Sequence, residues 1–245
     1  MEIRMNDITL VSVNWNQLDC VKLLLCSYVR HHYDGVPLRL MLYDNGSTDG
    51  SKQWLNENEI PFFDGYSNVG HENALNIIYN DIKTNKIILN DTDVEYKANV
   101  YGYLDEMKGS CISVGELIDG NYINQDKVKD RISPWFWMFD LNEMRRGGIR
   151  YFRNPAVEDW SYDVGSWQWE QMKNLGFTNF NLKREAGHQD HDLISMRYEK
   201  VDHIGKVSWN LKNHSDRYSE VMQRRDYVKE RLLFYQDIDL KNKFV

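Results

Sequence analysis

The sequence lacks three features that would assign it to a broad class at once. Among 245 residues it has few cysteines, no long basic run and no apolar stretch long enough to cross a bilayer. The three cysteines have no paired spacing, which favours buried thiols in a reducing compartment over disulfides. The first residues also lack the apolar core typical of a signal peptide. We therefore expect a cytoplasmic protein without a transmembrane segment, in the host cytoplasm if the source is viral or phage.

Charge and composition argue against two further classes. The formal net charge is -7, so nonspecific attraction to nucleic acid or to an anionic membrane has little support, and we expect no nucleic-acid partner. Hydrophobic residues make up 42% and charged residues 27%, which is ordinary for a folded globular protein and argues against disorder. A chain of this length can bury a sizeable core.

Apolar runs alternate with helical patterns along the first hundred residues. Strands are expected at 8–13, 38–43, 60–63 and 86–90, with apolar residues at helical spacing between them. Strands separated by such helices favour a mostly parallel central sheet covered on both faces. The sequence therefore predicts an α/β/α sandwich.

The second half of the chain is less regular. An aromatic strand is expected at 134–139, and a helix at 163–175 closed by Gly176. Residues 183–209 lack clear periodicity, whereas 218–235 has the pattern of a charged amphipathic helix.

The domain organisation follows from where the alternation ends. We expect one main domain at 1–212, with halves at 1–110 and 111–212. Residues 213–245 are expected to form a helical tail packed on this core.

Two carboxylates emerge together where a buried strand is expected to end. Asp91 and Asp93 follow the run 86–90, and carboxylates at a strand end can hold a hard divalent cation through oxygen. The alternative is an ordinary turn without a metal, because Asp, Asn and Thr side chains often form hydrogen bonds with nearby backbone groups in turns. A second acidic turn, beginning at Asp44 after the strand at 38–43, favours the ligand-binding interpretation. In an open α/β sheet, ligands bind at the carboxyl ends of the strands.

Four blocks in this region carry a resemblance to a known family. In order they are Val11–Asn16 (VSVNWN), Tyr43–Ser51 (YDNGSTDGS), Asn68–Asn76 (NVGHENALN) and Leu89–Asp93 (LNDTD). By their order, spacing and strand-end placement the chain resembles the nucleotide-diphospho-sugar glycosyltransferases of the GT-A fold, especially the family 2-like group. The resemblance implies a Rossmann-like α/β fold and a nucleotide-sugar-dependent transferase. Its acceptor would be a hydroxyl of a glycan or a related molecule.

The resemblance implies a metal site. Asp91 and Asp93 match the family's DXD motif, in which the second carboxylate usually coordinates the metal and the first acts on ribose or through water. Manganese or magnesium would bridge the donor's phosphates, and zinc suits such an oxygen-rich site less well. His203 lies in a segment resembling one that supplies another ligand in some relatives, with a structural histidine as the alternative. No metal is expected at His188 and His191.

The resemblance also implies a nucleotide-sugar site. Asn14 would lie near the base, and Asp44 or Asn45 would bond the polar edge of the base; UDP is favoured over GDP and dTDP. A segment that closes over the nucleotide in relatives corresponds here to Asn68, Gly70 and His71. The helix that follows would add backbone donors near phosphate. His71 either donates to phosphate when protonated or simply begins a surface helix.

An inverting transfer needs a base that takes the acceptor hydroxyl proton. Relatives place an Asp near the start of a helix after the acceptor strand, and Asp163 is the closest candidate. The Glu-Asp pair typical of relatives is not preserved at this position, although Glu158 and Asp159 lie just upstream. Inversion is therefore favoured by the resemblance alone, and the identity of the base stays open.

Three tryptophans are candidates for lining a groove that binds the acceptor sugar. Tryptophan faces pack against sugar C–H groups, and the side chains that invite this interpretation are Trp135, Trp137 and Trp167. Tryptophans in strands and amphipathic helices more often belong to the core, which is the alternative.

Two other functions stay open. The altered base region allows a catalytically silent protein that binds a glycan or a nucleotide on the same scaffold. A sugar nucleotidyltransferase would also need a cation site at a strand end. It is less favoured, because the chain lacks an evident glycine-rich loop bearing Lys or Arg for a triphosphate.

Overall fold

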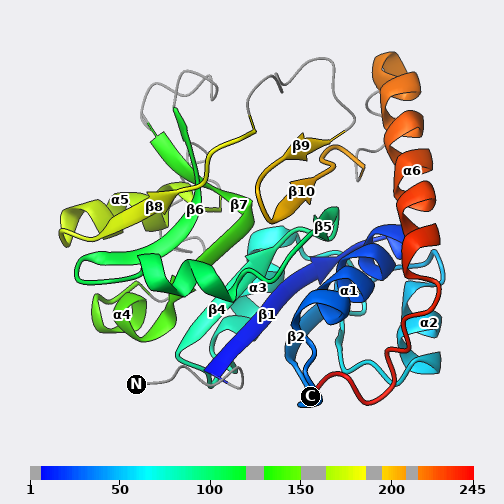
Figure 1. Cartoon of the computed structure of the whole chain (residues 1–245), viewed down its shortest axis with the longest axis horizontal. Coiled ribbons are helices and arrows are strands. Elements are labelled where there is room, and N and C mark those ends of the chain that lie inside the picture. Colours follow the sequence, from blue (N-terminus) through cyan, green and yellow to red (C-terminus); the bar gives the residue numbers. More distant parts are fainter. Residues whose placement is uncertain (1–6, 120–129, 150–163, 186–194, 208–214) are drawn as a thin grey trace.

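The computed structural model describes residues 7–119, 130–149, 164–185, 195–207 and 215–245 (Figure 1). Strands and helices alternate up to β4, in the order β1 (Ile8–Asn14), α1 (Leu18–His32), β2 (Arg39–Asp44), α2 (Ser51–Glu57), β3 (Phe63–Asp64), α3 (His71–Tyr79) and β4 (Lys86–Asn90). The elements that follow are β5 (Val94–Tyr96), η2 (Tyr101–Glu106), β6 (Cys111–Asp119), β7 (Asp130–Asp140), α4 (Leu141–Arg146), α5 (Ser166–Asn174), β8 (Thr178–Asn181), β9 (Met196–Arg197), β10 (Val201–His203), η4 (Ser215–Arg217), α6 (Tyr218–Leu232) and η5 (Leu233–Tyr235).

A seven-stranded sheet forms the centre, with strand order β3-β2-β1-β4-β7-β6-β8. Strands β1 to β4 pair in parallel, β7 runs antiparallel to β4 and β6, and β8 is parallel to β6. The mostly parallel sheet predicted from the sequence is confirmed. Because β1 lies between β2 and β4, the carboxyl ends of these three strands meet at one edge, where α/β sheets bind ligands.

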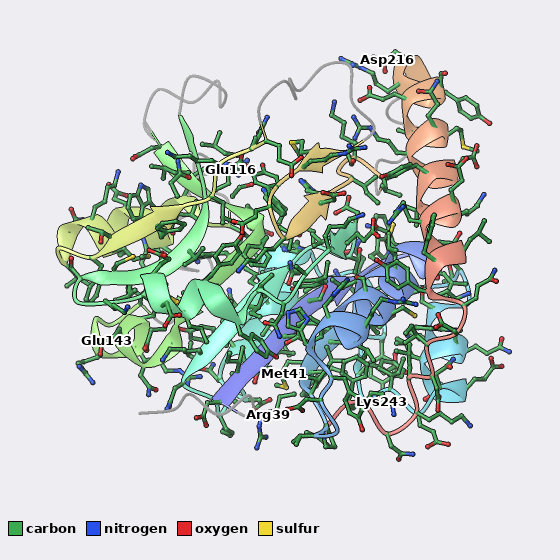
Figure 2. All side chains as sticks on the ribbon, in the orientation of Figure 1. Arg39, Met41, Glu116, Glu143, Asp216 and Lys243 are labelled. Carbon is green, nitrogen blue, oxygen red and sulfur yellow. The ribbon has the colours of Figure 1, made fainter. Side chains whose placement is uncertain are left out.

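Helices cover both faces of this sheet. Successive strand residues point to opposite faces, so Ile87 and Ile88 of β4 belong to different hydrophobic clusters. One cluster joins the sheet to residues of α1, α2 and α6, and the other joins it to residues of α3, α4 and α5. Figure 2 shows the side chains that fill these layers. The predicted α/β/α sandwich is therefore confirmed. It explains why all seven residues of β1 are buried.

A second, three-stranded sheet has the order β5-β10-β9 and is antiparallel. Figure 1 shows it between α6 and the strands β6 and β7. The sequence did not predict this sheet, since two of its strands fall within the segment 183–209 that lacks periodicity. Strands of two or three residues are too short to show a period.

The C-terminal segment lies against the first half of the chain. Arg30 of α1 donates to the Phe234 carbonyl at 2.8 Å and pairs with Asp237 at 2.6 Å. The last residues return to the start of β2 (Figure 1). There the Leu38 N–H donates to the Lys243 carbonyl at 2.7 Å. No helix within the described part of the chain combines the length and apolarity needed to span a membrane.

A buried histidine makes the stability of this fold depend on pH. His32 Nδ1 donates to the Tyr28 carbonyl at 2.9 Å, so Nε2 accepts from the Val100 N–H at 3.0 Å. Burial lowers the pKa of His32 from 6.5 to about 3. Between these pH values the unfolded chain binds a proton that the folded chain excludes, so stability is lost as pH falls through this window.

We predict that His32 destabilises the fold by about 1.4 kcal/mol per pH unit below pH 6.5. Urea unfolding of the wild type and of His32→Gln at pH 7.5, 6 and 5 measures this contribution. The stability advantage of the wild type over the variant should shrink as pH falls. An advantage that stays constant would contradict the assignment.

Candidate functional site

Three side chains at one edge of the central sheet form a candidate metal centre. Asp91 follows β4 directly, Asp93 precedes β5, and His203 ends β10. Each offers a ligand atom, and these three atoms all lie within 4.8 Å of one another. His203 Nε2 is 3.4 Å from Asp93 Oδ1. The structure thus brings together the three residues that the sequence proposed as metal ligands.

The small sheet holds His203 beside Asp93. In the pairing of β10 with β5, His203 stands opposite Val94. The Ile204 N–H donates to the Asp93 carbonyl at 2.9 Å, which extends the ladder to the ligand itself. The position of His203 therefore follows from backbone pairing as well as from side-chain contacts.

The strand end that carries the two carboxylates is fixed by buried polar groups. The Asp91 N–H donates to the Trp135 carbonyl at 3.0 Å, and Asn90 Nδ2 donates to the same oxygen at 3.2 Å. The Tyr96 hydroxyl donates to Asn90 Oδ1 at 2.5 Å. Sequence reasoning missed Asn90, although a buried amide next to an acidic pair is a signal of such bracing.

The electrostatics of this group suit a divalent cation. Burial raises the pKa of the Asp91 carboxyl, the nearby His71 opposes this shift, and the neighbouring Asp93 carboxylate adds to it. A cation held between the two carboxylates would offset their repulsion. Two carboxylate oxygens and one imidazole nitrogen fit Mn²⁺, and the oxygens also fit Mg²⁺.

A pocket of about 440 Å³ opens over the carboxylates. Its lining includes six residues that the sequence assigned to the site: Asn45, Asn68, Gly70, His71, Asp91 and Asp93. The other lining residues are Val13, Trp15, Gln17, Glu72, Thr92, Pro134 and Val164.

The start of α3 forms one wall of this pocket, through Gly70, His71 and Glu72. A helix N-terminus carries partial positive charge and favours anions. His71 Nε2 lies 3.9 Å from Asp91 Oδ1, so the imidazole faces the metal centre. This wall could therefore receive the negative charge of a phosphate group.

An amide bridge joins the second and third sequence blocks across the pocket. Asn45 Nδ2 donates to Asn68 Oδ1 at 3.0 Å, and Asn45 Oδ1 accepts from the Val69 N–H at 2.9 Å. Asn68 Oδ1 also accepts from the Gly70 N–H at 2.8 Å. The bridge sets the distance between the end of β2 and the start of α3.

Asn14 and Asp44 are not among the residues that line this pocket. Both side chains are fully buried. Asn14 Nδ2 donates to Asp44 Oδ2 at 2.9 Å, and Asp44 Oδ1 accepts from the Ser47 N–H at 2.8 Å. The sequence predicted that both would contact a nucleoside. In the structure their hydrogen bonds brace the loops after β1 and β2, and contact with a nucleoside stays a prediction for both residues.

Two pocket residues were missed by sequence reasoning. Trp15 follows β1 with 38% of its surface exposed, and its indole offers the pocket an aromatic face. Gln17 Oε1 accepts from the Thr92 hydroxyl at 3.0 Å, which connects the loop after β1 to the acidic turn. The available signal was a tryptophan directly after an expected buried strand, inside the first of the four sequence blocks.

The predicted acceptor tryptophans differ in their surroundings. Trp135 and Trp137 are 2% and 0% exposed and belong to the two core clusters on opposite faces of the sheet. Buried rings leave no open face for a sugar, so both residues follow the core-packing alternative. Trp167 of α5 is partly buried against the core. Asp163, the predicted base, lies outside the described residues.

Comparisons with known proteins identify the fold. No protein-family model and no curated protein matches the sequence. The chain is similar in structure to the mannosyltransferase PcManGT from Pyrobaculum calidifontis in complex with GDP-Man and Mn²⁺, with 14% identity and a TM-score of 0.55 over 74% of this chain. It is similar to GalNAc-T7 with UDP, GalNAc and Mn²⁺, with 13% identity and a TM-score of 0.57 over 73% of this chain.

The matched regions cover 57% of the mannosyltransferase and 42% of GalNAc-T7. Identities this low show the fold alone. The chain has the GT-A fold, as the four sequence blocks predicted.

The loop that carries Asn68 packs directly on Gly46, so a larger residue at this position should destabilise the fold. Gly46 has a φ of +80°, and a Cβ there would lie 2.7 Å from Ser67 Cα. Gly35 has a φ of +104°, and a Cβ added there would have no described atom within 4 Å, apart from its immediate chain neighbours. Gly35→Ala should cost about 1–2 kcal/mol through backbone conformation alone. Gly46→Ala should cost about 1–3 kcal/mol more, because it adds a backbone clash.

Denaturant unfolding of the two variants measures this difference. Equal losses of stability would show that the loop around Ser67 moves aside without cost, contrary to the packing described.

Proposed function

We propose that the chain is a glycosyltransferase that uses a divalent cation to move a sugar from a nucleotide-diphosphate donor to an acceptor hydroxyl. The observation that carries the proposal is the group Asp91, Asp93 and His203, whose ligand atoms lie within 4.8 Å of one another beside a pocket on the GT-A fold. The two similar structures add support, since each contains Mn²⁺ together with a nucleotide or a nucleotide sugar.

Asp93 and His203 would hold the cation, and Asp91 would contact it directly or through water. Mn²⁺ or Mg²⁺ bound there would supply positive charge to the departing nucleoside diphosphate. The start of α3 and the His71 imidazole would lie on the phosphate side of the pocket.

The nucleoside would occupy the part of the pocket between the first two sequence blocks. Asn45 is the member of the predicted set whose amide reaches the pocket, and Trp15 adds a ring on which a base could stack. One similar structure contains GDP-Man and the other UDP, so they do not favour UDP for this chain.

The acceptor half of the proposal rests on the sequence. Asp163 remains the proposed base, and a direct displacement with inversion remains the proposed course. The acceptor hydroxyl must come within hydrogen-bond reach of such a base for the proton to be transferred. Trp167 remains the proposed acceptor contact, as part of α5.

The first test removes the central ligand. Asp93→Asn should lower Mn²⁺-dependent transfer by at least about 100-fold, because the neutral amide is a far weaker ligand for a hard cation. The assay measures release of nucleoside diphosphate from a panel of UDP-, GDP- and dTDP-sugars, with and without Mn²⁺. Asp105→Asn, at an exposed position in η2, is the matched control and should keep full activity. Turnover by Asp93→Asn equal to that of the control would refute the metal role.

The second test identifies the base. Asp163→Asn should lower kcat by about 100-fold or more while leaving Mn²⁺ and nucleotide affinities unchanged, because it removes only proton transfer. Asp159→Asn and Glu158→Gln are the parallel variants, since either residue could take this role instead. A loss confined to one of these two would reassign the base. Nucleotide binding by the wild type with no transfer from any donor would instead favour the catalytically silent alternative.

A further inference from the structure

Trp135 touches the candidate metal centre at two points. Its indole lies flat against the His203 imidazole, with ring centroids 4.8 Å apart and planes 5° from parallel. Its backbone carbonyl accepts the hydrogen bond from the Asp91 N–H at 3.0 Å. One residue of β7 thus contacts two of the three ligand residues, which belong to different parts of the chain.

The indole itself is held in place by buried partners. Trp135 Nε1–H donates to Glu116 Oε2 at 3.0 Å, and the Tyr198 ring lies 4.7 Å from the indole, centroid to centroid. Arg184 Nε donates to Glu116 Oε1 at 2.7 Å and to the Tyr198 hydroxyl at 3.1 Å, which ties these two supports together. Turning the indole would break a charge-assisted hydrogen bond in a buried site. Glu116, labelled in Figure 2, belongs to β6.

His203 needs this support because its own hydrogen bonds do not fix its ring. Nδ1 is buried and has no hydrogen-bond partner among the described residues, while Nε2 faces Asp93 Oδ1. A metal-ligating histidine is usually oriented by a hydrogen bond from its second nitrogen. Here a stacked ring occupies one face of the imidazole.

We propose that Trp135 is a positioning residue for the metal centre: its stacked indole sets the plane of the His203 imidazole, and Glu116 sets the plane of the indole. This inference rests on the metal-dependent function proposed above. It gives Trp135 a role at the donor side of the site, in place of the acceptor contact that the sequence suggested. It also links the second half of the chain, through Glu116 and Arg184, to the cation.

The test compares two tryptophans of the same strand. Trp135→Leu removes the ring stacked on His203, whereas Trp137→Leu removes an equally buried ring that packs on Phe139 in the opposite core cluster. Both should lower Tm, because both leave a cavity. Mn²⁺ is the probe, added alone, and its affinity is measured from the free-ion signal in electron paramagnetic resonance.

Trp135→Leu should weaken Mn²⁺ binding about 10–100-fold, as loss of an orienting partner does, and Trp137→Leu should leave it unchanged. Trp135→Phe keeps a stacked ring, and Glu116→Ala keeps the indole without its acceptor; both should give smaller losses. The inference is overturned if Trp135→Leu and Trp137→Leu bind Mn²⁺ equally well, or if the affinity of all variants simply follows their Tm.

The outcomes separate this inference from the proposed function. If the wild type binds Mn²⁺ through Asp93 but transfers no sugar from any donor, the proposed transferase function is wrong. The positioning role of Trp135 at the metal site then still stands. If the wild type and Trp135→Leu bind Mn²⁺ equally well and both transfer sugar, only the positioning role is contradicted. A wild type that binds no Mn²⁺ overturns both.

Discussion

The antiparallel pairing of β5 with β10 is the constraint on which the candidate site depends. It joins two ligands that lie far apart in the sequence, Asp93 and His203, through a short backbone ladder. Bringing distant segments together costs loop-closure entropy, and a ladder of three residue pairs offers little to offset it. The small sheet therefore needs support from the rest of the fold.

The C-terminal helix provides that support. Arg231 of α6 makes a bidentate ion pair with the buried carboxylate of Glu95 on β5, at 2.7 Å, and the Tyr235 hydroxyl donates to the same carboxylate at 2.6 Å. Arg224 donates to the Ile204 carbonyl, directly after β10. Removing either partner of such a pair would leave a buried charge without compensation. The tail thus contributes to the geometry of the site, although none of its described residues, 215–245, lines the pocket.

Sequence patterns predicted the parts of this architecture that have a period or a strong local motif. The strands of the first half, their acidic ends at Asp44 and Asp91, and the helix starting at His71 follow from hydrophobic alternation and turn chemistry. The small sheet could not be predicted, because strands of two or three residues have no measurable period. The direction in which a side chain points also could not be predicted from the sequence. Asn14 stands at the predicted strand end yet points into the fold, and Trp135 and Trp137 share a strand yet face opposite cores.

The proposed function requires one cation to bind between the end of β4 and the end of β10. Crystals grown with Mn²⁺ and a nucleoside diphosphate, measured at the manganese absorption edge, test it most directly. We expect one anomalous peak within coordination distance of Asp93 and His203, with the diphosphate in the pocket beside α3. A peak elsewhere, or a nucleotide bound with these two side chains making no contact to metal, would contradict it.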